Sequence, residues 1–194
     1  MSTVELDSVI VPDSGETSVV ACDLTAYAKL SIVLTSTGYL GFLGTGFGYL
    51  RGCAIADPSR KVISIQGDAS VGLHLMELDA YTGFNLDIIT VVVNDASGGM
   101  SSNGQGVVRG PKNPIRPISA LGSATKYDVV ARGLDDIRGA VAKLLAQSGP
   151  SCINLIVDQK PIHPPPTAMV GLTEDSDSVV VPYYDNIPPA YYKL

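Results

Sequence analysis

Cysteine and basic residues are both scarce in this sequence. The three cysteines, Cys22, Cys53 and Cys152, are odd in number and far apart, with no Cys-x-x-Cys pair. This argues against a disulfide framework or a structural zinc site and favours a reducing compartment. Lys and Arg number 13 against 19 Asp and Glu, a net charge of −6. No basic face is therefore available to bind a nucleic acid.

A targeting sequence and a long apolar run are also lacking. The first 16 residues, MSTVELDSVIVPDSGE, carry acidic residues where a signal peptide would carry positive charge. No later apolar run approaches the length needed to span a bilayer. We therefore expect a soluble, cytoplasmic chain that has no membrane partner.

What the sequence does contain is enough apolar material for one domain. Of its 194 residues, 45% are hydrophobic, 16% are charged and 20 are glycine, a composition typical of a packed globular chain with many tight turns. The composition changes near the end, where proline and tyrosine accumulate. We expect a domain over residues 1–160 and an extended Pro/Tyr-rich tail over 161–194.

Apolar runs and amphipathic segments alternate along the chain. Strands are expected in 8–16, 60–68, 86–95, 126–131 and 151–158, and helices over 17–30, up to Pro58, over 70–84 and over 133–150. The last of these helices has Leu134, Ile137, Val141 and Leu144 on one face and Gly149-Pro150 after it. This alternation predicts an α/β fold: a parallel sheet flanked by helices on both faces, which binds ligands at the carboxyl ends of its strands.

Two of the predicted strands end by presenting a carboxylate on a turn of small residues. Asp68 follows the strand of 60–68, and Asp95 follows that of 86–95. Two carboxylates at neighbouring strand ends suit Mg²⁺, whose other ligands are water and substrate phosphate oxygens, and amides near Ala69 and Ser70 can face an anion at a helix start. The alternative left open is that Asp68 is a helix N-cap and Asp95 a turn former.

The segment upstream of Asp68 favours the metal-binding interpretation of the two aspartates. It carries glycines at 38, 41, 44, 46 and 48, leads through a short helix to Pro58, and continues into Gly67-Asp68 and, further on, Asn94-Asp95. Over residues 5–165 this spaced pattern resembles the diphosphate-binding domain of thiamine diphosphate enzymes, nearest the acetolactate synthase and 2-hydroxyacyl-CoA lyase group. The resemblance implies two cofactors, thiamine diphosphate and Mg²⁺.

The resemblance also assigns roles residue by residue. Asp68 and Asp95 would ligate the metal through their side chains, and Ser97 through its carbonyl, with Asn94 stabilising the turn. Gly67, Ala69 and Ser70 would lie against the diphosphate. The carbonyl of Gly41 would meet the pyrimidine amino group. Leu43 would be an apolar wedge beneath the cofactor, and Met100 would lie on the substrate side. For Leu43 and Met100, ordinary core packing stays an alternative.

The chain departs from the family pattern at two motif positions, with Ala69 in place of a glycine and Asp95 in place of an asparagine. It also has no room for the pyrimidine-binding domain whose glutamate activates the cofactor. The resemblance therefore implies one subunit of a split decarboxylase or carboligase, that is, a lyase or transferase. This subunit would be inactive alone and completed by a partner that carries the pyrimidine-binding domain. The complete enzyme would act on a 2-keto acid or related acyl donor and transfer a cofactor-bound carbanion. The alternative is a non-catalytic scaffold or regulatory relative.

Other classes fit the sequence less well. A dinucleotide-binding Gly-x-Gly-x-x-Gly run starting at Gly44 meets Tyr49 in place of its last glycine. A serine hydrolase elbow at DASVG fails because Asp68 replaces its first glycine. The glycine-rich segment 97–117 is expected to be a long loop beside the site, a candidate lid or substrate loop.

Overall fold

The computed structural model describes residues 8–13, 15–25, 32–34, 42–99, 127–158, 171–172 and 179–180. Its centre is a sheet of six parallel strands in the order β2-β1-β3-β4-β6-β5. The strands are β1 (Val9–Pro12), β2 (Ile32–Val33), β3 (Val62–Gly67), β4 (Ile88–Asn94), β5 (Tyr127–Ala131) and β6 (Ser151–Ile156). The parallel sheet and the five strands predicted from apolar runs are confirmed. The two-residue β2 was not predicted.

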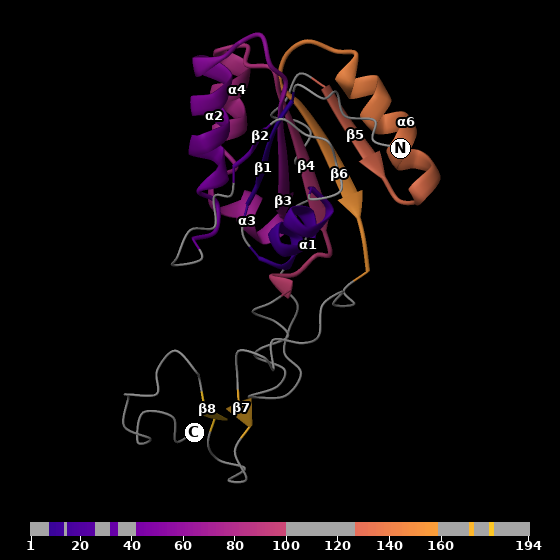
Figure 1. The fold of residues 1–194 in the computed structure, drawn as a ribbon. Coiled ribbons are helices and arrows are strands. Elements are labelled where there is room, and N and C mark those ends of the chain that lie inside the picture. Colours follow the sequence, from indigo (N-terminus) through magenta and orange to yellow (C-terminus); the bar gives the residue numbers. More distant parts are fainter. Residues whose placement is uncertain are drawn as a thin grey trace.

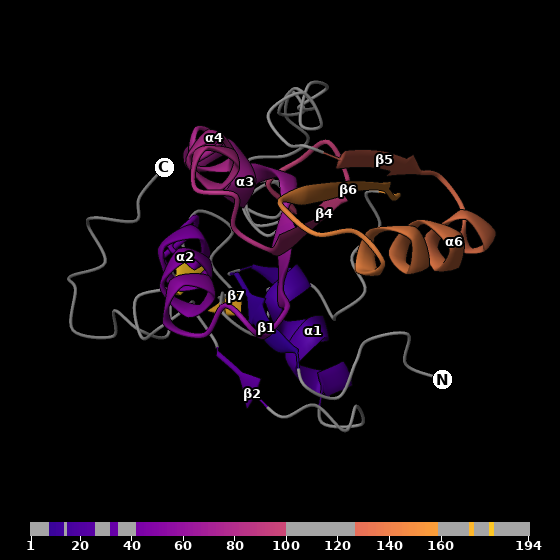
Figure 2. The same cartoon turned by 90° about the horizontal axis from the view of Figure 1, so that it is seen from above.

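Helices cover both faces of the sheet (Figures 1 and 2). The helices α2 (Gly46–Ala56), α3 (Asp68–Leu73) and α4 (Glu77–Gly83) lie on one side, and α1 (Glu16–Thr25) and α6 (Leu134–Leu145) lie on the other. A sheet covered in this way must bury side chains on both faces of its strands. The predicted three-layer α/β architecture is therefore confirmed.

Alternate residues of each strand enter two separate cores. Val9 and Val11 of β1 pack with Phe47 and Leu50 of α2, whereas Ile10, between them, joins the core under α6. The same alternation places Val62 and Ile63 of β3 in opposite cores. Successive side chains of a strand point to opposite faces, which explains why apolar residues stand next to each other along β1 and β3.

The strand order fixes where a ligand can bind. From β1 the chain passes to β2 on one side of it and then to β3 on the other, so the strand order reverses between β1 and β3. Open α/β sheets bind ligands at such a reversal, in the crevice outside the carboxyl ends of the strands. Asp13 follows β1 and Asp68 follows β3, so both lie at that edge.

Two predicted helices differ from those observed. The helix expected over 70–84 is two helices, because 3₁₀-type bonds interrupt it: the amide of His74 donates to the carbonyl of Val71, and that of Glu77 to the carbonyl of His74. Val71 of α3 and Leu78 of α4 are both fully buried, in the same core. The helix expected over 133–150 ends at Leu145, and its Leu134 is 86% exposed because it lies in the first turn, beyond the core that Leu144 fills.

No helix in these described segments is long and apolar enough to cross a bilayer. In the tail, only β7 (Gly171–Leu172) and β8 (Val179–Val180) are described, and they pair antiparallel. The predicted domain boundary at 160, the helix end at 26–30 and most of the loop at 97–117 lie outside the described residues.

Candidate functional site

The two predicted metal-binding carboxylates lie side by side. Strands β3 and β4 are parallel neighbours with Gly67 opposite Val93, and Asp68 and Asp95 are the first residues after these strands. Asp68 opens α3, but the N-cap is Gly67, and no side chain caps this helix. The N-cap interpretation of Asp68 is therefore wrong, and the two carboxyl groups meet as predicted.

Asp68 is buried among backbone donors. Its residue is 3% exposed, and its carboxyl accepts hydrogen bonds from the amides of Ala69 and Ser97. Burial, with the charge of Asp95 adding to it and these hydrogen bonds opposing it, raises the pKa of Asp68 to about 6. A carboxyl group with this pKa is largely ionised at neutral pH, which is the form that can bind a metal ion.

Asp95 faces Asp68 from a tight turn. Its Oδ1 accepts the amide hydrogen of Ser97 at 3.0 Å, so the predicted turn-forming role is confirmed. Burial raises the pKa of Asp95, the charge of Glu16 adds to this, and a hydrogen bond from Asp68 opposes it. In the metal-free chain, Asp68 therefore takes up a proton as the pH falls through about 6, and beside Asp95 this proton lies between two carboxyl groups.

Asn94 and Ala96 hold this turn in place. Oδ1 of Asn94 accepts the amide hydrogen of Ala96 at 3.0 Å, and Nδ2 donates to Oδ1 of Asn154 on β6 at 3.1 Å. Ala96 has a φ of +59°, in the left-handed region that few non-glycine residues adopt. The predicted turn-stabilising role of Asn94 is confirmed.

Small residues leave room beside the carboxylates. A Cβ on Gly99 would lie 3.2 Å from Oδ2 of Asp95 and 3.9 Å from Oε2 of Glu16, and a Cβ on Gly67 would lie 3.6 Å from Oγ1 of Thr17. The start of α1 therefore borders the site from a third side. Sequence reasoning missed Glu16, although it follows directly on the Pro-Asp-Ser-Gly turn at the end of β1.

Ser70 of α3 is bonded on both sides of its hydroxyl. Its Oγ donates to Oδ2 of Asp13 at 2.6 Å and accepts the amide hydrogen of Gly44 at 2.9 Å. Asp13 and Ser70 are both buried, at 0% and 1% exposed. Sequence reasoning also missed Asp13, and its position after an apolar strand, like that of Asp68, was the available signal.

The donor set fits Mg²⁺. Within the described segments, no three His, Cys, Asp or Glu side chains gather into a metal-binding group. The site instead offers the two hard oxygen donors of Asp68 and Asp95. Mg²⁺ is commonly held in this way, by one or two carboxylates, while water and phosphate oxygens fill its other positions.

The remaining predicted residues divide into three groups. Leu43 lies in the segment before α2 and is 41% exposed, so it is not a packed core residue and can meet a ligand. Gly67 and Ala69 flank Asp68, while the diphosphate contact predicted for them and for Ser70 stays a prediction. Gly41 and Met100 lie outside the described residues.

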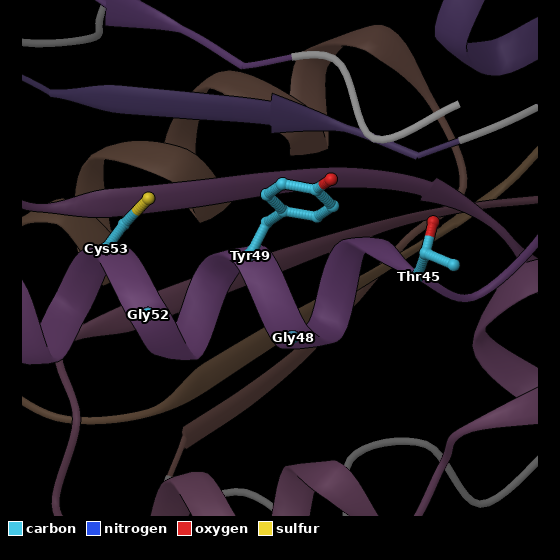
Figure 3. Close-up of a pocket in the computed structure, with 5 residues that line it drawn as sticks. All are labelled: Thr45, Gly48, Tyr49, Gly52 and Cys53. Atoms are coloured by element: carbon cyan, nitrogen blue, oxygen red, sulfur yellow. The ribbon is translucent and has the colours of Figure 1, made fainter. Parts of the chain in front are cut away.

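A separate hollow lies on the outer face of α2. It is lined by Thr45, Gly48, Tyr49, Gly52 and Cys53, and the side chains of the first, third and last of these rise from one face of the helix (Figure 3). Burial raises the pKa of Cys53, which keeps the thiol protonated and unreactive. The hollow contains none of the predicted site residues.

Residues 13–155 match the family model described as "Thiamine pyrophosphate enzyme, C-terminal TPP binding domain". A probable acetolactate synthase of Mycobacterium bovis is 26% identical over 176 residues, which cover 82% of this chain and 30% of that protein. A 2-hydroxyacyl-CoA lyase of Arabidopsis thaliana is 28% identical over 132 residues, covering 62% and 23%. The chain thus spans less than a third of these relatives.

A solved structure shares the fold. The thiamine diphosphate-dependent 4-hydroxybenzoylformate decarboxylase of Rhodococcus jostii superimposes with a TM-score of 0.64 at 17% identity, covering 78% of this chain and 30% of that one. At this identity the likeness concerns the fold alone. The family match, by contrast, extends from Asp13 to Leu155 and takes in Asp68 and Asp95. The chain therefore belongs to the thiamine pyrophosphate enzyme family and contains its C-terminal TPP-binding domain.

Proposed function

We propose that this chain binds Mg²⁺ through Asp68, Asp95 and the carbonyl of Ser97, and through it the diphosphate of thiamine diphosphate. The observation that carries the proposal is the meeting of two desolvated carboxyl groups at adjacent strand ends, within a segment matched by the TPP-binding family. A cation between the two carboxylates would offset the burial and the repulsion from Asp95 that raise the pKa of Asp68.

The chemistry proposed for the complete enzyme is that of a decarboxylase or carboligase acting on a 2-keto acid or related acyl donor. Bound thiamine diphosphate supplies a thiazolium carbon that stabilises an acyl carbanion. The share of this chain is to hold the metal and the diphosphate and, through Leu43 and Gly41, to support the cofactor. Support comes from the relatives named acetolactate synthase and 2-hydroxyacyl-CoA lyase.

The activating glutamate is proposed to come from a partner that carries a pyrimidine-binding domain. The chain matches less than a third of its relatives' length, so the remainder of such an enzyme is not represented by these 194 residues. A site shared between two proteins would leave this chain able to bind but inactive alone.

Cofactor binding is tested by thermal unfolding with Mg²⁺ and thiamine diphosphate. At a ligand concentration of about 100 Kd, binding adds about 2.7 kcal/mol and should raise the Tm by about 5–10 °C. Asp68→Ala should abolish the rise. Asp79→Ala, the same change at an exposed aspartate of α4, is the matched control and should keep it.

The partner is tested by capture of the chain from its native source, followed by measurement of carbon dioxide release from 2-keto acids. We expect release only when the captured pyrimidine-domain protein is present. Absence of a Tm shift in every combination would contradict cofactor binding. A Tm shift without any activity, even with the captured protein, would favour the scaffold or regulatory function instead.

A further inference from the structure

We infer that Asp13 is a positioning residue of this site: through the Ser70 hydroxyl it fixes the glycine-rich segment at Gly44 against the start of α3, which carries Asp68. Its importance for cofactor binding rests on the proposed function. The hydrogen-bonded relay, Asp13 to Ser70 to Gly44, can be tested without any cofactor.

The relay joins three segments that are distant in the sequence. Asp13 and Ser70 are 57 residues apart, and Gly44 and Ser70 are 26 apart. Asp13 follows β1, Ser70 lies in the first turn of α3, and Gly44 lies two residues before α2. Because β1 and β3 are adjacent, all three segments meet at the edge of the sheet where the strand order reverses.

Burial makes the relay costly to break. Asp13 is fully buried, and Ser70 is 1% exposed, so neither can exchange its partner for bulk water. Oδ2 of Asp13 lies 3.1 Å from where a Cβ on Gly46 would be, so the carboxyl packs directly on the first residue of α2. The start of a helix favours a negative charge at this position.

The geometry restricts what Ser70 can do for a ligand. Its hydroxyl has a single hydrogen, which goes to Asp13, and it accepts the amide hydrogen of Gly44. Contact of Ser70 with a diphosphate is thereby left to its backbone. The relay also orders the segment that carries Leu43 before any ligand binds, which lowers the entropy cost of binding.

The relay itself is tested by amide hydrogen exchange of Gly44. Ser70→Ala removes the acceptor and should speed this exchange about tenfold, the equivalent of one ordinary hydrogen bond. Ser64→Ala, at a buried serine of β3 that accepts a hydrogen bond from Gln66 at 2.6 Å, is the matched control and should leave Gly44 unchanged. Unchanged exchange in Ser70→Ala would overturn the inference.

The positioning role is tested by a double-mutant cycle on the Kd of thiamine diphosphate at saturating Mg²⁺. Asp13→Ala and Ser70→Ala should each raise the Kd about tenfold, and the double variant also about tenfold, because both remove one relay. Asp13→Asn keeps an acceptor oxygen and should retain most of the affinity. A hundredfold loss in the double variant would overturn the positioning role. If wild type binds no thiamine diphosphate, the proposed function fails, and the exchange of Gly44 alone decides the relay.

Discussion

Asp68 and Asp95 lie side by side at the ends of two adjacent parallel strands. Each aspartate is the first residue after its strand, so the register of β3 and β4 brings them together without any long-range loop. Burial, with the charge of Asp95 adding to it, disfavours ionisation of Asp68 and raises its pKa to about 6. A metal ion bound by this pair, as proposed above, would compete with a proton for Asp68 as the pH falls through about 6.

The free energy of unfolding of the metal-free chain should rise as the pH falls from 7.5 through about 6. The pKa of Asp68 is about 6 in the folded chain against an ordinary value of 3.8, so the folded state binds a proton in this range that the unfolded state does not. Above pH 6, ionised Asp68 lowers the free energy of unfolding by its full amount. This loss of stability is relieved as the pH falls toward 4.

This prediction is checked by urea unfolding at several pH values, with Asp68→Asn as reference. The reference keeps the shape of the side chain but cannot ionise, so it removes the contributions of all other groups by difference. We expect the free energy of unfolding of wild type to rise relative to that of the variant as the pH falls. A difference that stays constant between pH 7.5 and 4.5 would contradict a raised pKa at Asp68.

Binding of Mg²⁺ should release a proton near pH 6. Because metal and proton compete for the same carboxyl oxygens, the apparent affinity should fall by up to about tenfold for each pH unit below 6. Titration calorimetry in two buffers of different ionisation enthalpy measures the protons released. In Asp95→Asn the charge that raises the pKa of Asp68 is gone, so the release should shift to lower pH. Equal release at pH 5 and pH 8 would rule out this competition.

The Asp68 and Asp95 pair could be predicted from the sequence because strand ends are local features. Each carboxylate follows a strand rich in β-branched residues, and parallel neighbours end at one edge of the sheet. The partners of Asp13 could not be found in this way. Its contact with Ser70 depends on β1 lying beside β3, and periodicity alone does not give a strand order.

The helix break between α3 and α4 escaped prediction for a different reason. Val71, Leu75 and Leu78 recur at helical spacing whether or not the helix is continuous. The break lies in the 3₁₀-type bonds around His74, and neither a proline nor a loop-like run of residues marks it. The two-residue β2 was missed because so short a strand carries no pattern of its own.

Gly44→Ala should lower the free energy of unfolding by about 1–3 kcal/mol. Gly44 has a φ of +83°, and an added Cβ would overlap Nδ1 of His74 and lie 3.3 Å from Cβ of Leu73. Gly52→Ala is the matched control: it is exposed within α2 with nothing near its Cβ position, and it should gain about 0.5–1 kcal/mol. Urea unfolding of both variants checks the difference. Equal effects of the two changes would show that the backbone at Gly44 relaxes.

Lys61→Met should lower stability without changing cofactor affinity. Lys61 precedes β3, at the end of the sheet opposite Asp68, and its Nζ donates to Oδ1 of Asp87 at 3.0 Å and to the carbonyl of Gln147 at 2.7 Å. Removing this cation takes the donor from the carbonyl of Gln147 and leaves Oδ1 of Asp87 with the amide of Gly149 at 3.3 Å, at a cost of about 1–3 kcal/mol. Urea unfolding measures this loss, and the Kd of thiamine diphosphate with Mg²⁺ should stay within about twofold of wild type.

The matched control for this change is Arg51→Met. Arg51 pairs with Glu77 at 3.4 Å, but the two side chains are 46% and 37% exposed, so solvent screens the pair and its loss should cost less than about 1 kcal/mol. If Arg51→Met destabilises the chain as much as Lys61→Met, burial does not distinguish the two ion pairs. If Lys61→Met weakens cofactor binding more than tenfold, the two ends of the sheet are coupled. Cofactor affinity would then depend on residues at both ends of the sheet and not at the carboxyl ends alone.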